Sequence, residues 1–211
     1  MRKLVSINAL LLTWLVVGYL PAQPGSVSPS ADPELRDELL KRVADDQNIR
    51  KQLISKGIEQ PDQQLLARMK EIDTANEERI TAIVRQYGWP SSQLVGRDGA
   101  EAAFLLVQHA GLTLQKKVLP LVEKAYRSGD LSGQSYALLC DRVLVREGKP
   151  QVYGTQAKRI EEWKGREPVA EPIADEANVD KRRAKLGLPP LSEYLQMMKQ
   201  IYFPENGPQP K

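Results

Sequence analysis

The stretch Asp98-Gly-Ala-Glu-Ala-Ala-Phe-Leu-Leu-Val-Gln-His109 decides the fold class of this chain. Every residue from Ala102 to Val107 is apolar, so a helix over this stretch is apolar on all of its faces. Such a helix must be surrounded by other elements to be stable in water. The stretch therefore predicts a central, buried helix that ends in two polar residues, Gln108 and His109.

Helical patterns extend from this stretch in both directions along the chain. Asp32-Pro33 has the form of an N-cap followed by proline, and it predicts a helix that runs to about Ser55. A second long helix is predicted between Pro61 and Gly88, with Asn76 on its apolar stripe. Asp98 and Glu101 have the spacing of a capping box before the central helix. Further helices are predicted over residues 113–127, from Ser132 to just before Gly148, and over residues 178–186 and 191–203.

The pattern changes after Gly148. Residues 152–163 and 168–173 flank Lys164-Gly165, which predicts a small β-hairpin or an extended arm. The length of 211 residues suits one domain with a core of its own. The sequence thus predicts a mainly α fold: a single helical domain with a small β-hairpin in its C-terminal half.

The N-terminus has the layout of a secretory signal peptide. Arg2 and Lys3 precede an apolar stretch from Leu10 to Leu20, and Pro21-Ala22 leads into a segment rich in proline, serine and glycine. The apolar stretch is shorter than the ~20 residues that span a bilayer comfortably. We expect a signal peptide over residues 1–22, a flexible linker over 23–31, a helical domain over 32–203 and a disordered tail over 204–211.

This organisation predicts an exported protein, periplasmic or extracellular, with no membrane span in the mature chain. An uncleaved leader that acts as an N-terminal inner-membrane anchor is the alternative.

Composition excludes several classes of chemistry. The formal charge is +3, and removal of Arg2 and Lys3 with the leader leaves +1, so nucleic acid is not an expected partner. The basic run over residues 181–185 is expected to be the solvated face of a helix. One histidine and one cysteine make a zinc site with the usual ligands improbable, and neither a phosphate loop nor a dinucleotide fingerprint occurs. We therefore expect no metal and no cofactor, and we expect Cys140, in an apolar helical stretch, to be a buried, unreactive thiol.

Several polar residues occupy positions where helical spacing directs them inward. Asp141 has apolar residues three and four positions away on both sides, and a buried carboxylate needs a cation or several hydrogen-bond donors. The loop that follows the Asp141 helix is close enough to fold back over the end of that helix. The predicted site has His109 and Asp141 as catalytic residues, with a ligand-binding set of Asn76, Gln108, Arg142, Tyr153 and Gln156.

Motifs along the chain resemble those of a bacterial family known as domain of unknown function 6624. They are Asp73-Xaa-Xaa-Asn76, Tyr87-Gly-Trp-Pro90, Leu94-Val-Gly96, Leu106-Val-Gln-His-Ala110, Leu119-Pro120, Asp141-Arg-Val143, Tyr153-Gly-Thr-Gln156, Val179-Asp-Lys-Arg-Arg-Ala184 and Gly187-Leu-Pro-Pro-Leu191. The resemblance covers about residues 72–194. Phe104 stands where tryptophan is expected in this family, and Cys140 also departs from its pattern. The family implies no particular activity, cofactor or partner.

Three functions are consistent with these residues. The leading one is a binding module, periplasmic or at the cell surface, for an unknown polar ligand or a protein partner. The second is a small hydrolase or transferase with His109 as general base, oriented by Asp141. In the third the polar residues form a hydrogen-bond network that joins helices to the loop, and the domain is a structural scaffold.

Overall fold

A computed structural model describes residues 30–56, 62–163 and 165–203. The predicted leader, most of the linker and the tail lie outside this part of the chain. Within it, the mainly α fold is confirmed by α1 (Pro33–Ser55), α2 (Gln63–Tyr87), α3 (Ser92–His109), α4 (Leu112–Arg127), α5 (Gly133–Arg146), α6 (Val179–Lys185) and α7 (Leu191–Tyr202). None of the helices in the described segments is long and apolar enough to cross a bilayer.

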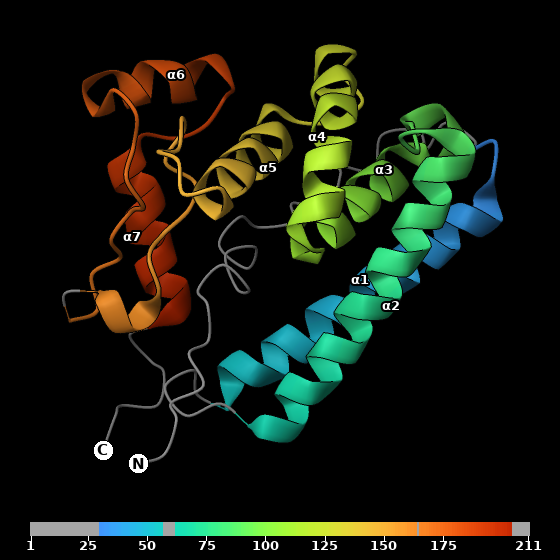
Figure 1. Ribbon diagram of the computed structural model, residues 1–211, viewed down its shortest axis with the longest axis horizontal. Helices are drawn as coiled ribbons and strands as arrows, with labels where there is room; N and C mark the ends of the chain where they lie inside the picture. Colours follow the sequence, from blue (N-terminus) through green and yellow to red (C-terminus); the bar gives the residue numbers. More distant parts are fainter. Residues whose placement is uncertain (1–29, 57–61, 164, 204–211) are drawn as a thin grey trace.

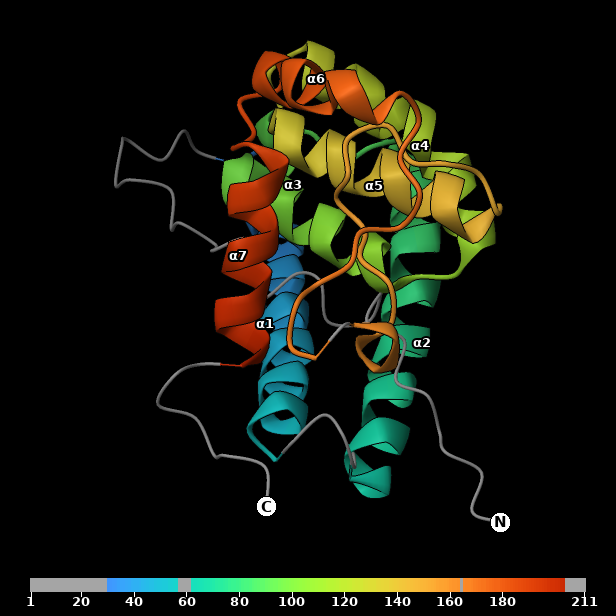
Figure 2. The ribbon, with the colours of Figure 1, turned by 90° about the vertical axis from the view of Figure 1, so that its left-hand side faces the viewer.

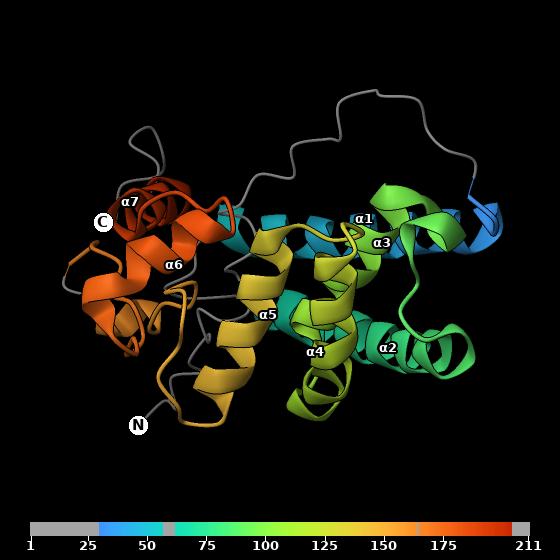
Figure 3. The ribbon, with the colours of Figure 1, turned by 90° about the horizontal axis from the view of Figure 1, so that it is seen from above.

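Helix α3 is the centre of the helical core, as its sequence predicts. All residues from Ala102 to His109 are buried, and α3 packs against α1, α2, α4 and α5. Figure 1 shows α1 and α2 side by side, and Figure 3 shows α4 and α5 crossing this pair. The apolar face of each surrounding helix covers a different face of α3, which is how an all-apolar helix becomes stable in water.

Helices α1 and α2 are joined by polar contacts as well as by packing. Glu38 binds Arg79 in a two-bond ion pair, and Arg42 donates to the Oδ1 atom of Asn76 at 3.2 Å. One and two turns further along α1, Asp46 and Arg50 continue the same row. A ladder of charged and amide groups therefore runs along the interface between the two helices.

The predicted β-hairpin is wrong, because the described residues contain no strand. Two isolated bridges form instead, a parallel one between Gln151 and Ile173 and an antiparallel one between Ala157 and Ala170. A short 3₁₀ turn, η2 (Ile160–Glu162), replaces the end of the first predicted strand. In the second predicted strand, the prolines at 168 and 172 have no N–H to donate to a β-ladder. The pair of segments is thus closer to the extended arm that the same pattern allowed.

The arm and α7 share a second, smaller core at one end of the molecule (Figure 2). Its buried members are Ala157, Trp163, Tyr194, Met198 and Tyr202. The ring of Trp163 meets that of Tyr202 edge to face, with centroids 5.5 Å apart. This core fixes the arm against α7.

The basic run was expected to be a solvated helix face, but two of its arginines point inward. Arg183 is 1 % exposed and donates to the carbonyls of Tyr153 and Pro189. Arg182 donates to the carbonyls of Val152 and Ala174. Both guanidinium groups therefore hold the arm, because carbonyl oxygens of irregular backbone need donors when they are covered.

Candidate functional site

The structure divides the seven predicted site residues into two groups. Asn76, Gln108 and His109 lie where α2 and the end of α3 meet α1. Asp141, Tyr153 and Gln156 lie where α5 meets the arm. Arg142 connects the groups, since its Nη1 atom donates to the backbone carbonyl of Gln108 at 2.7 Å. The single cleft predicted for all seven is therefore replaced by two separate polar clusters.

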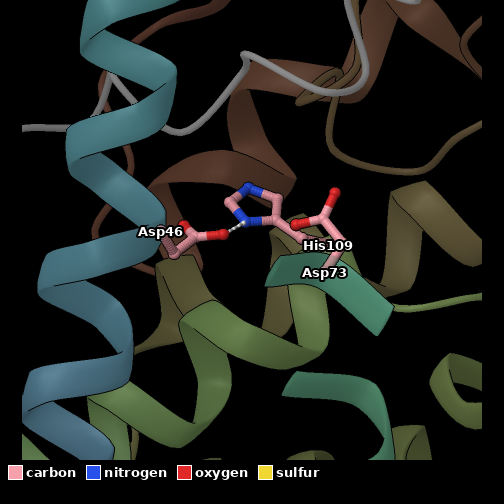
Figure 4. A group of neighbouring side chains, drawn as sticks. All are labelled: Asp46, Asp73 and His109. Carbon is pink, nitrogen blue, oxygen red and sulfur yellow. Dashed lines mark hydrogen bonds and ion pairs between the residues drawn. The ribbon is translucent and has the colours of Figure 1, made fainter. Parts of the chain in front are cut away.

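His109 is the last residue of α3, and its side chain is 2 % exposed. Its Nδ1 atom lies 3.0 Å from Oδ1 of Asp46 (Figure 4). The same atom lies 3.0 Å from Nε of Arg50, which is also a residue of α1. Arg50 Nε also lies 3.2 and 3.3 Å from the two oxygens of Asp46. The carboxylate that contacts His109 is therefore that of Asp46.

Nδ1 of His109 has two neighbours with opposite hydrogen-bonding roles. An arginine donates only, and Nε of Arg50 is placed to donate to Nδ1; a carboxylate accepts only, so a hydrogen bond to Oδ1 of Asp46 needs an N–H on Nδ1. The two contacts therefore correspond to different tautomers of the neutral ring. In both tautomers Nε2 is buried with no hydrogen-bond partner in the described chain. The ring thus presents an unpaired polar atom on the side away from Asp46.

Asp73 from α2 completes the charges around His109. Nη2 of Arg50 forms ion pairs with both Asp73 and Asp46. Burial raises the pKa of Asp73 to about 6; the negative charge of Asp46 acts in the same direction, and Arg50 opposes both. Burial also acts to raise the pKa of Asp46, but the contacts with His109 and Arg50 outweigh it and hold that pKa well below its usual range. Burial, reinforced by Arg50, lowers the pKa of His109 to about 4. The imidazole is consequently neutral at pH 7.

Asp46, Asp73 and His109 also have the spacing of a metal site. Each offers one ligand atom, and these atoms lie within 4.8 Å of one another. However, the guanidinium group of Arg50 contacts all three side chains and already supplies a positive charge there. A divalent cation would have to displace Arg50, so the arrangement fits a charge-balanced hydrogen-bond network better than a metal centre.

Other polar groups beside this network lack partners. Gln108 is fully buried, and neither Nε2 nor Oε1 of its side chain has a hydrogen bond to a described residue. Nδ2 of Asn76 is likewise buried without a partner. We call these residues the α3-end cluster, which consists of Asp46, Arg50, Asp73, Asn76, Gln108 and His109.

Asp141 has a different role from the predicted one. Its carboxylate accepts hydrogen bonds from the backbone N–H groups of Val152, Tyr153 and Thr155 and from the Thr155 hydroxyl, at 2.7–3.1 Å. It makes no hydrogen bond to His109, so the predicted His109–Asp141 pair is wrong. The four donors satisfy a fully buried carboxylate and tie the start of the arm to α5.

Gln156 and Tyr153 belong to the same structural cluster as Asp141. The N–H of Gln156 donates to the side chain of Gln151, and its own Nε2 donates to the Thr155 hydroxyl at 3.0 Å. The half-buried ring of Tyr153 meets that of Tyr136 edge to face. These contacts hold the fold of the loop. Within this cluster, the Oε1 atom of Gln156 is buried without a partner among the described residues.

Asp46 and Arg50 are site residues that sequence reasoning missed. Their signal lies in the spacing of α1, where the inward positions follow one another at intervals of four and three. Leu35, Leu39, Arg42, Asp46, Arg50 and Leu53 occupy these positions. A charged residue at an apolar position of this series needs a buried partner, as Asn76 does on α2.

Comparison with known protein families identifies this chain. The model of a family of unknown function, DUF6624, matches residues 33–204. The chain belongs to this family. The match covers more than the residues 72–194 that carry the motifs, and it includes α1 with Asp46 and Arg50. Comparisons with curated proteins and with solved structures find no match.

Proposed function

We propose that this member of the DUF6624 family is an exported binding module, and that its α3-end cluster takes up a small polar ligand. Export is supported by the charged, apolar and Pro/Ser-rich order of residues 1–30. After cleavage of the leader we expect a mature chain in the periplasm or outside the cell. If the leader remains, we expect a chain anchored in the inner membrane.

The observation that carries the proposal is the side chain of Gln108. It is fully buried, and both its donor and its acceptor lack partners in the described structure. Each unsatisfied buried group costs about 1–3 kcal/mol of stability. The next residue, His109, adds an unpaired ring nitrogen at Nε2. A ligand with N–H or O–H donors and a carbonyl or hydroxyl acceptor would satisfy these groups.

The charges of the cluster narrow the class of ligand. Asp46 and Asp73 share the positive charge of Arg50, whereas Arg42 pairs with Glu38. Arg142 adds one buried positive charge behind Gln108. Two carboxylates and two guanidinium groups leave the surroundings close to neutral, which suits a neutral ligand.

A hydrolase or transferase with His109 as general base is the second candidate. The contact between Asp46 and His109 favours it, with Asp46 in the role predicted for Asp141. An efficient general base has a pKa near the working pH, however, and that of His109 is lowered to about 4. This low basicity makes binding the better supported function.

Two glutamine substitutions test the proposal. Gln108→Leu removes a buried amide without partners, so we expect the free energy of unfolding to rise by about 1–2 kcal/mol. Gln115→Leu is the matched control, because this equally buried amide donates to two carbonyls and accepts from Arg146. We expect the control to lower the free energy of unfolding by about 2–3 kcal/mol. Urea unfolding of both variants measures the difference.

Mass spectrometry of the small molecules released on denaturation provides the second measurement. We expect the natively purified wild type to release a small polar compound that Gln108→Leu protein lacks. If Gln108→Leu is as destabilised as the control and the wild type releases nothing, the cluster serves the fold alone, and the scaffold function replaces binding.

A further inference from the structure

Figure 2 shows the arm and α7 side by side. A groove lies between them. Its volume is about 410 Å³, and one wall is the extended segment 167–173. The side chains of Leu191 and Leu195 from α7 form the other wall. The groove is therefore a long depression beside extended backbone, rather than an enclosed cavity.

The extended wall has backbone groups without partners. The carbonyl of Val169 and the N–H of Glu171 both bond to the neighbouring segment of the arm. Because peptide groups alternate in direction along an extended chain, the N–H and C=O of Ala170 point to the opposite side. The carbonyl of Pro172 and the N–H of Ala174 bond to Gln151, which leaves Ile173 in the same situation as Ala170. Segment 167–173 thus has one paired edge and one open edge.

The side chains of the groove combine apolar and acidic character. Val169, Ile173 and the two leucines supply apolar surface, and Glu167, Glu171 and Glu176 supply carboxyl groups. Glu167 pairs with Lys199, whereas Glu171 and Glu176 form no ion pair with any described residue. Burial raises the pKa of Glu171 and the charge of Glu162 adds to this effect, while the charges of Lys158 and Arg159 oppose both.

The surrounding sequence has the same sign of charge. Residues 161–180 contain seven acidic and two basic residues, a formal charge of −5 in a chain whose total is +3. This asymmetry attracts positively charged partners and opposes acidic ones.

We propose that this groove binds an extended, basic segment of a partner protein, which adds as a strand to the open edge at Ala170 and Ile173. Backbone hydrogen bonds to the open edge supply affinity, as in other cases of strand addition. Alternate side chains of the segment lie on the apolar surface, and its lysines or arginines pair with Glu171 and Glu176. This groove is independent of the α3-end cluster, so either proposal can fail without the other.

The test uses the full chain and the peptide acetyl-Lys-Val-Lys-Val-Lys-Val-amide. We expect the peptide to bind and to slow hydrogen exchange at the amides of Ala170 and Ile173. Glu171→Gln is expected to weaken binding about two- to fivefold, as for a partly exposed ion pair. Glu71→Gln, an exposed glutamate on α2, is the matched control and is expected to leave the affinity unchanged.

A second peptide separates strand addition from simple attraction of charge. The same sequence with N-methylated valines keeps every positive charge but loses backbone donors, and we expect its affinity to fall at least about tenfold, or 1.4 kcal/mol. Equal binding of both peptides, no binding of the first, or protection at amides elsewhere would each overturn the proposal.

Discussion

At the scale of single residues, the chemistry of His109 is determined by neighbours from a distant part of the chain. Asp46 precedes it by 63 residues and Arg50 by 59. Asp46 orients the ring, while burial and Arg50 lower the pKa of the imidazole to about 4. His109 is therefore uncharged at neutral pH, and its Nε2 atom is left for a hydrogen bond.

Asp73 and His109 have opposite effects on the pH dependence of stability. The folded pKa of Asp73 is raised to about 6, so its contribution is present below pH 3.8 and is lost as the pH rises through 6. The folded pKa of His109 is lowered from 6.5, so its contribution is present above pH 6.5 and is lost as the pH falls through 4. The two contributions oppose each other between pH 4 and 6.

Asp73→Asn should reveal the contribution of His109. We expect the free energy of unfolding of this variant to rise with pH more steeply than that of the wild type between pH 4 and 6. The difference in slope is expected to approach about 1.4 kcal/mol per pH unit. Urea unfolding at several pH values measures it, with the exposed Asp45→Asn as control. Parallel pH profiles for Asp73→Asn and the wild type would contradict the raised pKa.

Cys140 shows that low reactivity does not require full burial. The residue is half-buried, not fully buried as its apolar surroundings predicted. Burial still raises the pKa of its thiol to about 12, and the nearby charge of Asp141 acts in the same direction. Since the thiolate is the reactive form, this pKa agrees with the expected unreactive thiol.

At the scale of helices and loops, the start of α3 differs from its sequence pattern. Asp98 and Glu101 do not form the predicted capping box, because α3 begins at Ser92 and is kinked at Gly96, where φ is +73°. The carboxylate of Asp98 binds Arg36 of α1, and that of Glu101 binds Ser132 and Ser135 at the start of α5. Contacts between helices have replaced a local cap.

Two serine N-caps provide a matched test of capping. Ser132 accepts the N–H of Ser135 at 3.0 Å, whereas Ser91, at the start of α3, makes no side-chain cap bond. We expect Ser132→Ala to lower the free energy of unfolding by about 1 kcal/mol and Ser91→Ala to change it by a few tenths at most. Urea unfolding compares the two; similar losses would show that Ser91 caps α3 after all.

The cluster around Asp141 allows a sharper test of a structural role. Asp141→Ala leaves several buried N–H groups without an acceptor, so we expect a loss of at least about 2–3 kcal/mol. Hydrogen exchange should accelerate at Val152, Tyr153 and Thr155. Asp180→Ala is the control, because this exposed aspartate accepts only the N–H of Leu191. Unchanged stability of Asp141→Ala would return Asp141 to the candidate catalytic residues.

At the scale of the whole molecule, the described residues form one large helical core and two smaller ones, and they carry two separate polar clusters. The α3-end cluster lies among the long helices, and the Asp141 cluster lies between α5 and the arm. The groove proposed to bind a peptide lies between the arm and α7. The proposed functions therefore use different surfaces of one domain.

The proposed export concerns the whole chain and can be tested on it. We expect protein from the periplasmic or secreted fraction to begin at Gln23, because the leader pattern places cleavage after Ala22. Intact mass measurement decides this. A mass that retains residues 1–22 in a membrane fraction would support the inner-membrane anchor instead.

Local patterns in the sequence predicted the helices of the described residues, although α3 begins at Ser92, six residues before the predicted start at Asp98. The apolar run at 102–107, the cap at Asp32 and the proline and glycine signals predict elements that the structure confirms within a few residues. These features depend on neighbours three or four positions away, which a single helix places in contact. The family resemblance, which rests on short motifs, is confirmed by the match of the family model over residues 33–204.

Only the tertiary structure decided which polar residues meet. The spacing around Asp141 predicted a buried carboxylate correctly, but it did not decide which of several candidate donors would satisfy it; the structure shows that these are backbone amides of the arm. His109 contacts Asp46 because α1 packs against α3. The helical period of a sequence predicts which face of a helix is buried, but it does not predict which residue of another helix lies opposite. The arm lacks strands because its prolines and its contacts with Arg182, Arg183 and α7 replace a ladder. These outcomes depend on the packing of elements far apart in the chain.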